Sequence, residues 1–402
     1  MPTVSNLYIG LMSGTSLDGV DGVLVDFGPS ASPSSASSPS IPSTPSRSSN
    51  FRVVQHASAA FGAALKQEFW ALNTAGSNEI HRAALAANAL ADLYAAVVAD
   101  LLTASQTASG DVAAIGAHGQ TVRHRPLEFD GIGYTSQINN PALLAELTGI
   151  RVVADFRSRD VAAGGQGAPL VPAFHREVFG LPGQAIAVLN LGGISNVTLL
   201  PAQDGPHAHA HALADAVLGF DCGPANALMD YWCHQHTGQA FDAGGQWAAS
   251  GQVHGALLAR LLAEPYFAKA PPKSTGRDLF NVPWLASRLA TYPGLVPADV
   301  QATLAELTVQ SCAAAVLQYQ PDSQQLIVCG GGALNQHVMN RLQQHLPGLR
   351  VQSSSTCGLP PLQVEATAFA WLARQTLLGQ AGNLPKVTGA QGARILGAIY
   401  PA

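Results

Sequence analysis

Three short apolar runs in this sequence each end in a glycine-rich turn. The runs lead into Ser13-Gly14-Thr15-Ser16, Gly192-Gly193 and Gly330-Gly331-Gly332. A short apolar run bounded by such turns is typical of a buried strand. Glycine lets the backbone approach a ligand closely, and ligands of α/β folds gather where strands end. We therefore expect strands whose ends carry binding loops.

Strands and helices alternate along much of the chain. The patterns predict a strand–loop–strand hairpin over 7–12 and 19–27, helices over 60–71 and 79–102, and further strands at 51–56, 112–117, 150–155, 187–191 and 325–329. This alternation indicates a layered α/β architecture. With 402 residues, of which 47% are hydrophobic, the chain is long enough for two domains with separate cores.

Composition narrows the class of protein. A formal net charge of -5 and only 11% charged residues give no basic surface for nucleic acid. The five cysteines are scattered without a zinc-ligand spacing, which favours a reduced cytosolic protein. The N-terminus has no leader pattern, and no apolar run approaches the roughly 20 residues of a membrane span. We expect a cytoplasmic enzyme with neither a nucleic-acid nor a membrane partner.

One segment cannot contribute to a core. Residues 28–50 are almost entirely Ser, Pro and Ala. Such a composition buries little apolar surface and does not favour regular structure. We expect a flexible, solvent-exposed insertion there.

The first glycine-rich turn is suited to a phosphate chain. Its backbone amides and hydroxyl groups can converge without a bulky side chain in the way. It lacks the lysine of a P-loop and joins two strands instead of opening a helix, so a Walker-type site is excluded. A plain hairpin turn is the alternative. Asp18 and Asp21 favour the phosphate site, because a carboxylate beside phosphates is favourable when it faces Mg²⁺, its water shell or a substrate hydroxyl.

The order and spacing of the three turns resemble the actin-like ATPase superfamily of sugar kinases, chaperones and actin. Within it, five motifs together resemble the anhydro-N-acetylmuramic acid kinase family: GLMSGTSLDGVD (10–21), AHGQT (117–121), VADFRSRD (153–160), GFDCGPAN (219–226) and PKSTGR (272–277). The resemblance spans nearly the whole chain. The insertion at 28–50 is the main departure and lies away from every motif.

This resemblance implies a two-domain actin-like α/β fold around a central interdomain cleft. The expected domains are 1–145 with 375–402, and 146–374, of which the second carries the adenosine-binding loop. The implied reaction uses ATP and Mg²⁺. It opens the 1,6-anhydro ring of 1,6-anhydro-N-acetylmuramic acid with water and phosphorylates O6, giving N-acetylmuramic acid 6-phosphate in cell-wall recycling. The family also implies a homodimer.

The resemblance assigns roles to individual residues. Asp221 would be the base that takes a proton from the attacking water; the alternative is an N-cap for the helix expected after Ala225. Asp18 would organise Mg²⁺. The expected nucleotide-binding residues are Gly14, Thr15, Ser16, Leu17, Asp18, Gly19, Val20, Asp21, Gly192, Gly193, Ser195, Asn196, Gly330, Gly331, Gly332 and Asn335.

Polar residues after the predicted strands are candidates for contacts with the sugar. They are His118, Gln120, Thr121, Asn140 with its neighbours Gln137 and Asn139, Arg157, Asp160 and Glu365. His118 could instead be a buried histidine bonded to nearby backbone. Arg157 could bind the lactyl carboxylate bidentately or form an internal ion pair with Asp155 or Asp160. Glu365 opens a predicted helix over 366–372, where a carboxylate also favours the helix dipole.

Lys273, Ser274, Thr275 and Arg277 form the chain's only compact group of basic and hydroxyl side chains. This group could reach a phosphate, or it could be a helix-capping loop. Two rival functions stay open: another kinase or ATPase activity on the same scaffold, and a non-catalytic sensor that binds ATP and cell-wall fragments.

Overall fold

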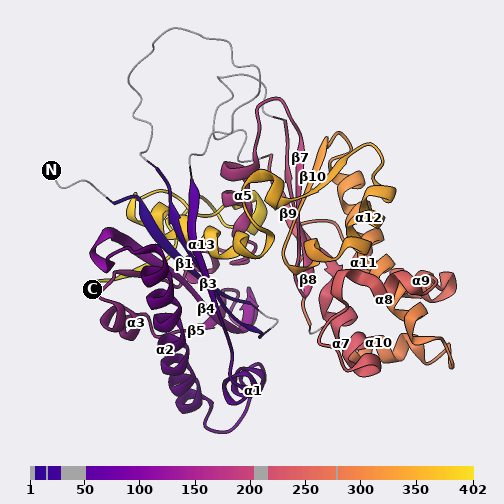
Figure 1. Cartoon of the computed structure of the whole chain (residues 1–402), viewed down its shortest axis with the longest axis horizontal. Coiled ribbons are helices and arrows are strands. Elements are labelled where there is room, and N and C mark those ends of the chain that lie inside the picture. Colours follow the sequence, from indigo (N-terminus) through magenta and orange to yellow (C-terminus); the bar gives the residue numbers. More distant parts are fainter. Residues whose placement is uncertain (1–4, 15–16, 29–50, 203–215, 278) are drawn as a thin grey trace. The chain divides into compact units, whose positions relative to one another are not determined.

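The computed structural model describes residues 5–14, 17–28, 51–202, 216–277 and 279–402. The chain forms two compact units: unit 1 comprises Met1–Val178 and Gln363–Ala402, and unit 2 comprises Phe179–Leu362 (Figure 1). Most of the predicted insertion at 28–50, together with the predicted phosphate-loop residues Thr15 and Ser16, lies outside the described residues.

Unit 1 is built on a mixed sheet. Its described strands run in the order β12-β6-β4-β1-β2-β3, with β5 paired to β4. Their bounds are β1 (Leu7–Ser13), β2 (Gly19–Asp26), β3 (Arg52–Ala60), β4 (Val112–Pro126), β5 (Gly133–Ile138), β6 (Val152–Ala154) and β12 (Ala398–Tyr400). The predicted hairpin is confirmed, since β1 and β2 pair antiparallel with Leu7 opposite Asp26. β1, β4 and β6 run parallel, so their carboxyl ends share one edge.

Helices cover both faces of this sheet. They are α1 (Ala63–Leu72), α2 (Glu79–Ser105), α3 (Pro141–Thr148), α4 (Ser158–Ala162), α5 (Val171–Phe179), α13 (Val364–Leu377) and α14 (Pro385–Thr388). Ile9 and Leu11 of β1 belong to one buried cluster with Tyr94 of α2. Gly10, between them, faces the backbone of α13 instead. Because successive strand residues point to opposite faces, α2 and α13 lie on opposite sides of the sheet.

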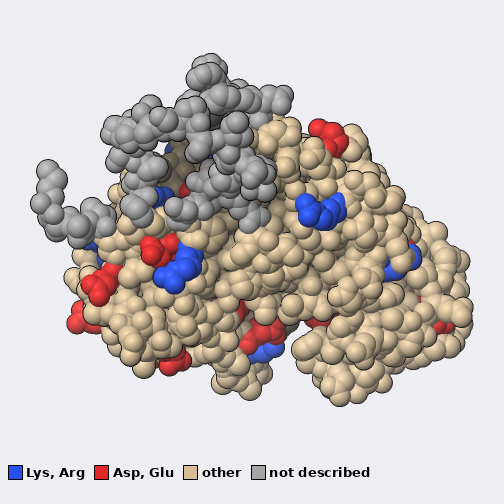
Figure 2. All heavy atoms as spheres, turned by 45° about the horizontal axis from the view of Figure 1, so that its top comes forward, with Lys and Arg blue, Asp and Glu red and all other residues tan. Residues whose placement is uncertain are grey.

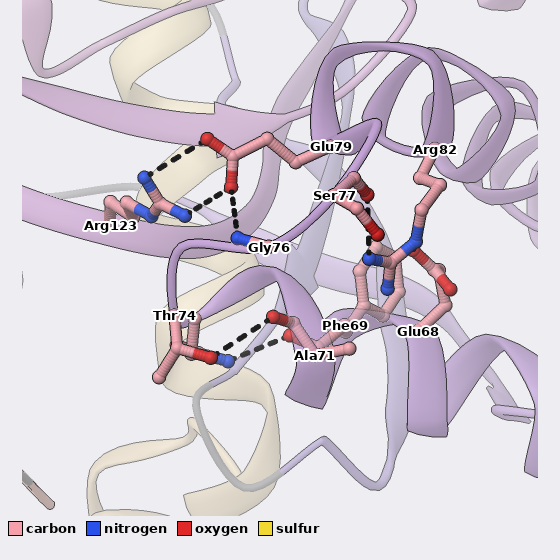
Figure 3. Close-up of polar contacts among 10 residues, drawn as sticks. Glu68, Phe69, Ala71, Thr74, Gly76, Ser77, Glu79, Arg82 and Arg123 are labelled. Atoms are coloured by element: carbon pink, nitrogen blue, oxygen red, sulfur yellow. Dashed lines mark hydrogen bonds and ion pairs between the residues drawn. The ribbon is translucent and has the colours of Figure 1, made fainter.

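An ion pair fixes the start of α2 against β4. Arg123 Nη2 lies 2.6 Å from Glu79 Oε2, which also accepts a hydrogen bond from the Gly76 amide at 3.2 Å (Figure 3). The hydrogen bond from Arg123, then that from Gly76, lowers the pKa of Glu79. This contact holds α2 beside the strand that carries His118.

Unit 2 repeats the strand order of unit 1. Its described strands follow the order β11-β10-β7-β8-β9, with bounds β7 (Ile186–Leu191), β8 (Ile194–Leu200), β9 (Leu218–Pro224), β10 (Gln325–Cys329) and β11 (Arg350–Ser353). β7, β8 and β9 form an antiparallel meander, as β1, β2 and β3 do in unit 1. β10 and β11 run parallel to β7, as β4 and β6 run parallel to β1. The predicted α/β class, with two units each built on its own sheet, is confirmed.

One long helix lies at the centre of unit 2. The helices are α7 (Asn226–Thr237), α8 (Gln246–Ser250), α9 (Gly255–Leu262), α10 (Val282–Leu289), α11 (Pro297–Tyr319) and α12 (Gln336–His345). Among the described residues, α2 and α11 are long and apolar enough to cross a membrane by length and composition. Core helices pass the same test. In α11, 83% of the most apolar stretch is buried within the protein, while α2 buries one stripe that includes Leu90, Tyr94, Val97 and Leu101.

The two units meet along the chain at Val178/Phe179 and at Leu362/Gln363. The sequence predicted domain boundaries after residues 145 and 374. The physical reason is pairing and packing: β6 is hydrogen-bonded to β4, and α13 packs on β1, so both belong to unit 1.

On the face drawn in Figure 2, acidic and basic side chains are few and interspersed.

Candidate functional site

A closed ring of hydrogen bonds joins the end of β1 to the middle of β4. Ser13 Oγ donates to the Gly119 carbonyl at 2.9 Å, and the Gly119 amide donates to the Tyr94 hydroxyl at 3.1 Å. Tyr94 Oη lies 3.0 Å from Ser13 Oγ. Because the Ser13 proton is already used, Tyr94 is the donor in that contact. Burial raises the pKa of Tyr94, so its hydroxyl stays protonated.

The predicted phosphate turn leaves this ring at Gly14. The Gly14 carbonyl accepts hydrogen bonds from the Leu17 amide at 3.2 Å and from Gln120 Nε2 at 3.2 Å. Leu17 has a φ of 58°, in the left-handed region. The exposed Asp18 carboxylate lies 3.4 Å from Lys66 Nζ, and Asp21 Oδ1 lies 3.3 Å from His56 Nε2.

His118 and Arg157 form a buried pair. Arg157 Nε and Nη2 approach His118 Nε2 at 3.2 and 2.9 Å, and Arg157 Nη1 donates to the Gly167 carbonyl at 2.8 Å. Burial, and then the Arg157 charge, lowers the pKa of His118 to about 3. His118 is therefore neutral, with its proton on Nδ1 and its Nε2 lone pair directed to Arg157. It is not available as a base.

This geometry bears on the alternatives left open for His118 and Arg157. The Nε2 atom of His118 is held by the Arg157 guanidinium group, and backbone hydrogen bonds at Gly119 and Ser13 also act on the imidazole. Within the described part of the chain, Arg157 makes no ion pair with Asp155 or Asp160 that meets contact distance. Asp155 instead accepts a hydrogen bond from Ser158 Oγ.

Two of the predicted sugar contacts, Asp160 and Asn140, have hydrogen-bond partners within the protein. Asp160 is fully buried; Oδ2 accepts from the Gly167 amide at 2.8 Å, while Oδ1 accepts from Asn383 Nδ2 at 2.6 Å and Thr388 Oγ1 at 2.8 Å. Asp160 thus holds the Gly-rich loop that follows α4. Asn140 caps α3 through the Leu143 amide.

A polar cavity of about 260 Å³ lies in unit 1 beside these residues. It lies beside the middle of β4 and the carboxyl ends of β5 and β6, and its lining includes His118, Gln137, Asn139, Asp155 and Ser158. Gln120 and Thr121 lie next to His118 along β4; Gln120 is fully buried, and Thr121 Oγ1 accepts a hydrogen bond from Gln137 Nε2 at 3.3 Å. The fold therefore brings most of the predicted sugar contacts of unit 1 to one region.

Glu365 lies in the first turn of α13, as predicted. Burial raises its pKa, the positive charge of Arg157 lowers it, and the negative charge of Asp21 raises it again. Asp21, Arg157 and Glu365 come from three distant segments of unit 1. The charges of Arg157 and Asp21 both act on Glu365, so the fold brings the start of β2 and the His118–Arg157 pair to the same region as the first turn of α13.

In unit 2 the second and third glycine-rich turns lie against each other. A Cβ atom on Gly330, whose φ is 77°, would lie 2.4 Å from Asn190 Oδ1, and one on Gly332 would lie 2.5 Å from Leu191 Cβ. Asn226 at the start of α7 joins the two turns. Its backbone amide donates to the Gly192 carbonyl at 2.9 Å, and its side-chain Nδ2 lies near Gly331. Only glycine fits such close backbone approaches.

The other predicted nucleotide contacts of unit 2 border these turns. Ser195 Oγ donates to the Gly223 carbonyl at 3.0 Å, and Asn196 lies opposite Asp221 in the β8–β9 pairing. Asn335 caps α12 through the Val338 amide at 3.1 Å. Gly193 faces the Arg277 guanidinium, which lies 3.5 Å from the position of a Cβ atom there.

Asp221 lies in β9, so it does not cap α7, whose N-cap residue is Ala225. Its Oδ2 accepts the Thr275 amide at 2.9 Å, and its carbonyl accepts the Tyr266 hydroxyl at 2.8 Å. Burial raises the pKa of Asp221 to about 7, although the Thr275 hydrogen bond and the Lys273 charge both lower it. A carboxyl group with this pKa can accept a proton near neutral pH.

Lys273 is fixed close to this carboxyl group. Its Nζ lies 5.0 Å from the Tyr266 ring centroid and 5.6 Å from that of Phe220, and it donates to the Phe267 carbonyl at 3.3 Å. The Lys273 carbonyl also accepts the Asp221 amide at 3.3 Å. The segment over 273–275, predicted to be either a phosphate contact or a capping loop, therefore packs along the strand that carries Asp221.

A family model described as anhydro-N-acetylmuramic acid kinase matches residues 6–402. The chain belongs to the anhydro-N-acetylmuramic acid kinase family. A relative of that name from Variovorax paradoxus (strain S110) is 65% identical over 396 residues, covering 98% of this chain and 99% of its own. Another, from Albidiferax ferrireducens, is 61% identical over 412 residues, covering 99% and 100%. The resemblance found in the sequence is confirmed.

Sequence reasoning missed two tyrosines of this anhydro-N-acetylmuramic acid kinase family member. Tyr94 closes the ring at the phosphate turn, and Tyr266 holds the backbone of Asp221. Both are buried. The one signal in the sequence is that a buried tyrosine needs a hydrogen-bond partner, which says nothing about where that partner lies.

Proposed function

We propose that this chain is an ATP-dependent kinase that opens the 1,6-anhydro ring of 1,6-anhydro-N-acetylmuramic acid with water and phosphorylates O6. The product is N-acetylmuramic acid 6-phosphate. The observation that carries the proposal is Asp221, a half-buried carboxyl group beside Thr275 and Lys273 with a pKa of about 7. Membership of the family supports the choice of substrate.

The chemistry needs one base. Water attacks the anomeric carbon, the bond from that carbon to O6 breaks, and O6 takes the γ-phosphoryl group of ATP. Asp221 receives the proton that the water loses. One of its oxygens is fixed by the Thr275 amide, which orients the carboxylate. His118 is excluded from this role because its lone pair is directed to Arg157.

The glycine-rich turns fit a nucleotide. Gly14 in unit 1 and Gly192, Gly193 and Gly331 in unit 2 present backbone without side chains. Asp18 is exposed and fits a Mg²⁺ ion that keeps most of its water ligands, since the described residues contain no cluster of three or more His, Cys, Asp or Glu. When bound, Mg²⁺ would neutralise charge on the phosphates.

The setting of the reaction is also part of the proposal. We place the protein in the cytoplasm, as a homodimer that recycles cell-wall fragments. The rivals are a kinase for another sugar and a sensor that binds ATP and cell-wall fragments without catalysis.

A mass spectrum separates these functions. The protein is incubated with ATP, Mg²⁺ and 1,6-anhydro-N-acetylmuramic acid, and the sugar is weighed. A gain of phosphate plus water supports the proposal. A gain of phosphate alone indicates an ordinary kinase, and an unchanged sugar favours the sensor.

The pH dependence of turnover should report on Asp221. With its pKa near 7, the carboxylate form needed for a base is lost as the pH falls through 7, so kcat/KM should fall on the acid side. Lys273→Met removes a positive charge that lowers this pKa, and should move the acid limb to higher pH. The control is Lys269→Met, because Lys269 is not among the charges acting on Asp221. Equal profiles for both variants would contradict the assignment.

Asp18→Asn should impair the use of nucleotide more than the binding of sugar. The Asp18 carboxylate is exposed and its contact with Lys66 is long, so the substitution should leave the fold intact. Calorimetry of ATP with Mg²⁺ and of the sugar, each titrated into the variant, measures the two affinities. A variant that binds ATP normally and loses sugar binding would refute the role of Asp18.

A further inference from the structure

The strand that carries Asp221 has a neighbouring strand on one side only. Among the described strands, β9 lies at the edge of the unit 2 sheet, next to β8. An edge strand has backbone groups that no strand binds on its open side. For Asp221 one segment binds both groups: its amide donates to the Lys273 carbonyl at 3.3 Å, and its carbonyl accepts from the Tyr266 hydroxyl at 2.8 Å. The position of Asp221 therefore depends on this segment.

The Tyr266 hydroxyl is a fixed donor. The residue is buried, and burial, followed by the negative charge of Asp221, raises the pKa of Tyr266, so the hydroxyl stays protonated. Phe267 packs on the same strand, since a Cβ atom on Gly223 would lie 2.6 Å from Phe267 Cε1. The short helix η3 (Pro265–Ala268) therefore contacts β9 at Asp221 and at Gly223.

Other side chains support the Tyr266 ring. Phe280 meets it edge-on with ring centroids 5.8 Å apart, and Trp284 meets Phe280 edge-on at 5.1 Å. Trp284 Nε1 donates to Glu264 Oε2 at 2.9 Å. The Lys273 ammonium group lies 5.0 Å from the Tyr266 ring centroid. Edge-to-face and cation–π contacts favour one orientation of a ring, so the hydroxyl is directed to one point.

We propose that Tyr266 is a positioning residue for the proton transfer. Its hydroxyl holds the backbone of Asp221, so that the carboxylate stays bonded to the Thr275 amide while it takes the proton from water. This role rests on the proposed function of Asp221 as the base. A misplacement of about 1 Å can slow a reaction roughly 10²-fold, so a hydrogen bond that does not touch the substrate can still affect the rate.

Tyr266→Phe removes the hydroxyl and keeps the ring that faces the Lys273 ammonium group. It should lower kcat about tenfold and leave KM for ATP and for the sugar within about twofold, because the hydroxyl binds the backbone of Asp221. The matched control is Tyr292→Phe, which removes a hydrogen bond of the same kind elsewhere in unit 2, from the Tyr292 hydroxyl to the Ala256 carbonyl at 3.1 Å. It should keep the wild-type kcat.

A double variant shows whether Tyr266 acts through Asp221. In the Asp221→Asn background, Tyr266→Phe should change kcat by less than about twofold, because asparagine takes no proton wherever it lies. An equal loss in both backgrounds would point to a general structural defect and overturn the proposal. Wild-type kcat in the single variant Tyr266→Phe would also overturn it.

The Thr275 amide reports the position of the carboxylate without turnover. Its hydrogen exchange, followed by NMR, should be about 2- to 10-fold faster in Tyr266→Phe, the factor equivalent to the net strength of one hydrogen bond, and unchanged in Tyr292→Phe. Unchanged exchange in Tyr266→Phe contradicts the role of Tyr266. A wild-type protein that yields no phosphorylated sugar would instead contradict the proposed function, and the exchange of Thr275 would still decide whether Tyr266 holds Asp221.

Discussion

Asp221→Asn should lower kcat by about 10²- to 10⁴-fold, the usual contribution of a general base. Asparagine has nearly the shape of aspartate and can still accept the Thr275 amide, so the local structure should persist. What it loses is the ability to take a proton from the attacking water. The rate of product formation, followed by mass spectrometry at a pH above 7, measures the effect.

Binding distinguishes this loss from misfolding. Asp221→Asn should bind ATP and the sugar with affinities close to those of wild type, because the change is confined to proton transfer. Asp322→Asn, at an exposed position of unit 2, is the matched control and should turn over normally. Near-normal turnover by Asp221→Asn would show that another group is the base.

Gly10→Ala should be among the most destabilising single substitutions in unit 1. A Cβ atom at this position would lie 1.8 Å from the Ala366 carbonyl oxygen and 2.7 Å from the Ala370 nitrogen. Both are backbone atoms of α13, which cannot move aside without separating from β1. We expect a loss of about 3 kcal/mol or more in the free energy of unfolding, or failure to fold. Thermal unfolding followed by circular dichroism measures it.

The matched control is Gly62→Ala. This glycine has a φ of -62°, and a Cβ atom added there has open space around it. Its substitution should change the free energy of unfolding by no more than about 1 kcal/mol. If Gly10→Ala melts at the temperature of Gly62→Ala, the close approach of α13 to β1 is wrong.

Local patterns sufficed for much of the framework. The β1–β2 hairpin, the strand before Gly330 and the helix that begins near Glu365 were all predictable, because each depends on hydrophobic periodicity and turn residues within a few positions. The strand β9 was not predicted. Its glycines and Asp221 read as a loop before a helix, and only pairing with β8 makes it a strand.

Side-chain roles were harder to predict than elements. Asp160 and Arg157 share one charged motif, yet Asp160 binds Asn383 and Thr388 from the far end of the chain, while Arg157 binds His118. Asn139 and Asn140 are adjacent, but one caps α3 and the other is left unpaired. A motif gives the identity of a polar group and does not give its partner.

The sequence by itself therefore determined the family, the glycine-rich turns and Asp221 as the candidate base, because these depend on residues adjacent along the chain. Only the tertiary structure decided the charge state of Asp221, the neutrality of His118 and the pairing of the second and third glycine-rich turns. The physical reason is that burial, hydrogen bonds and neighbouring charges set the pKa of a side chain. Those neighbours come from segments that the fold alone brings together.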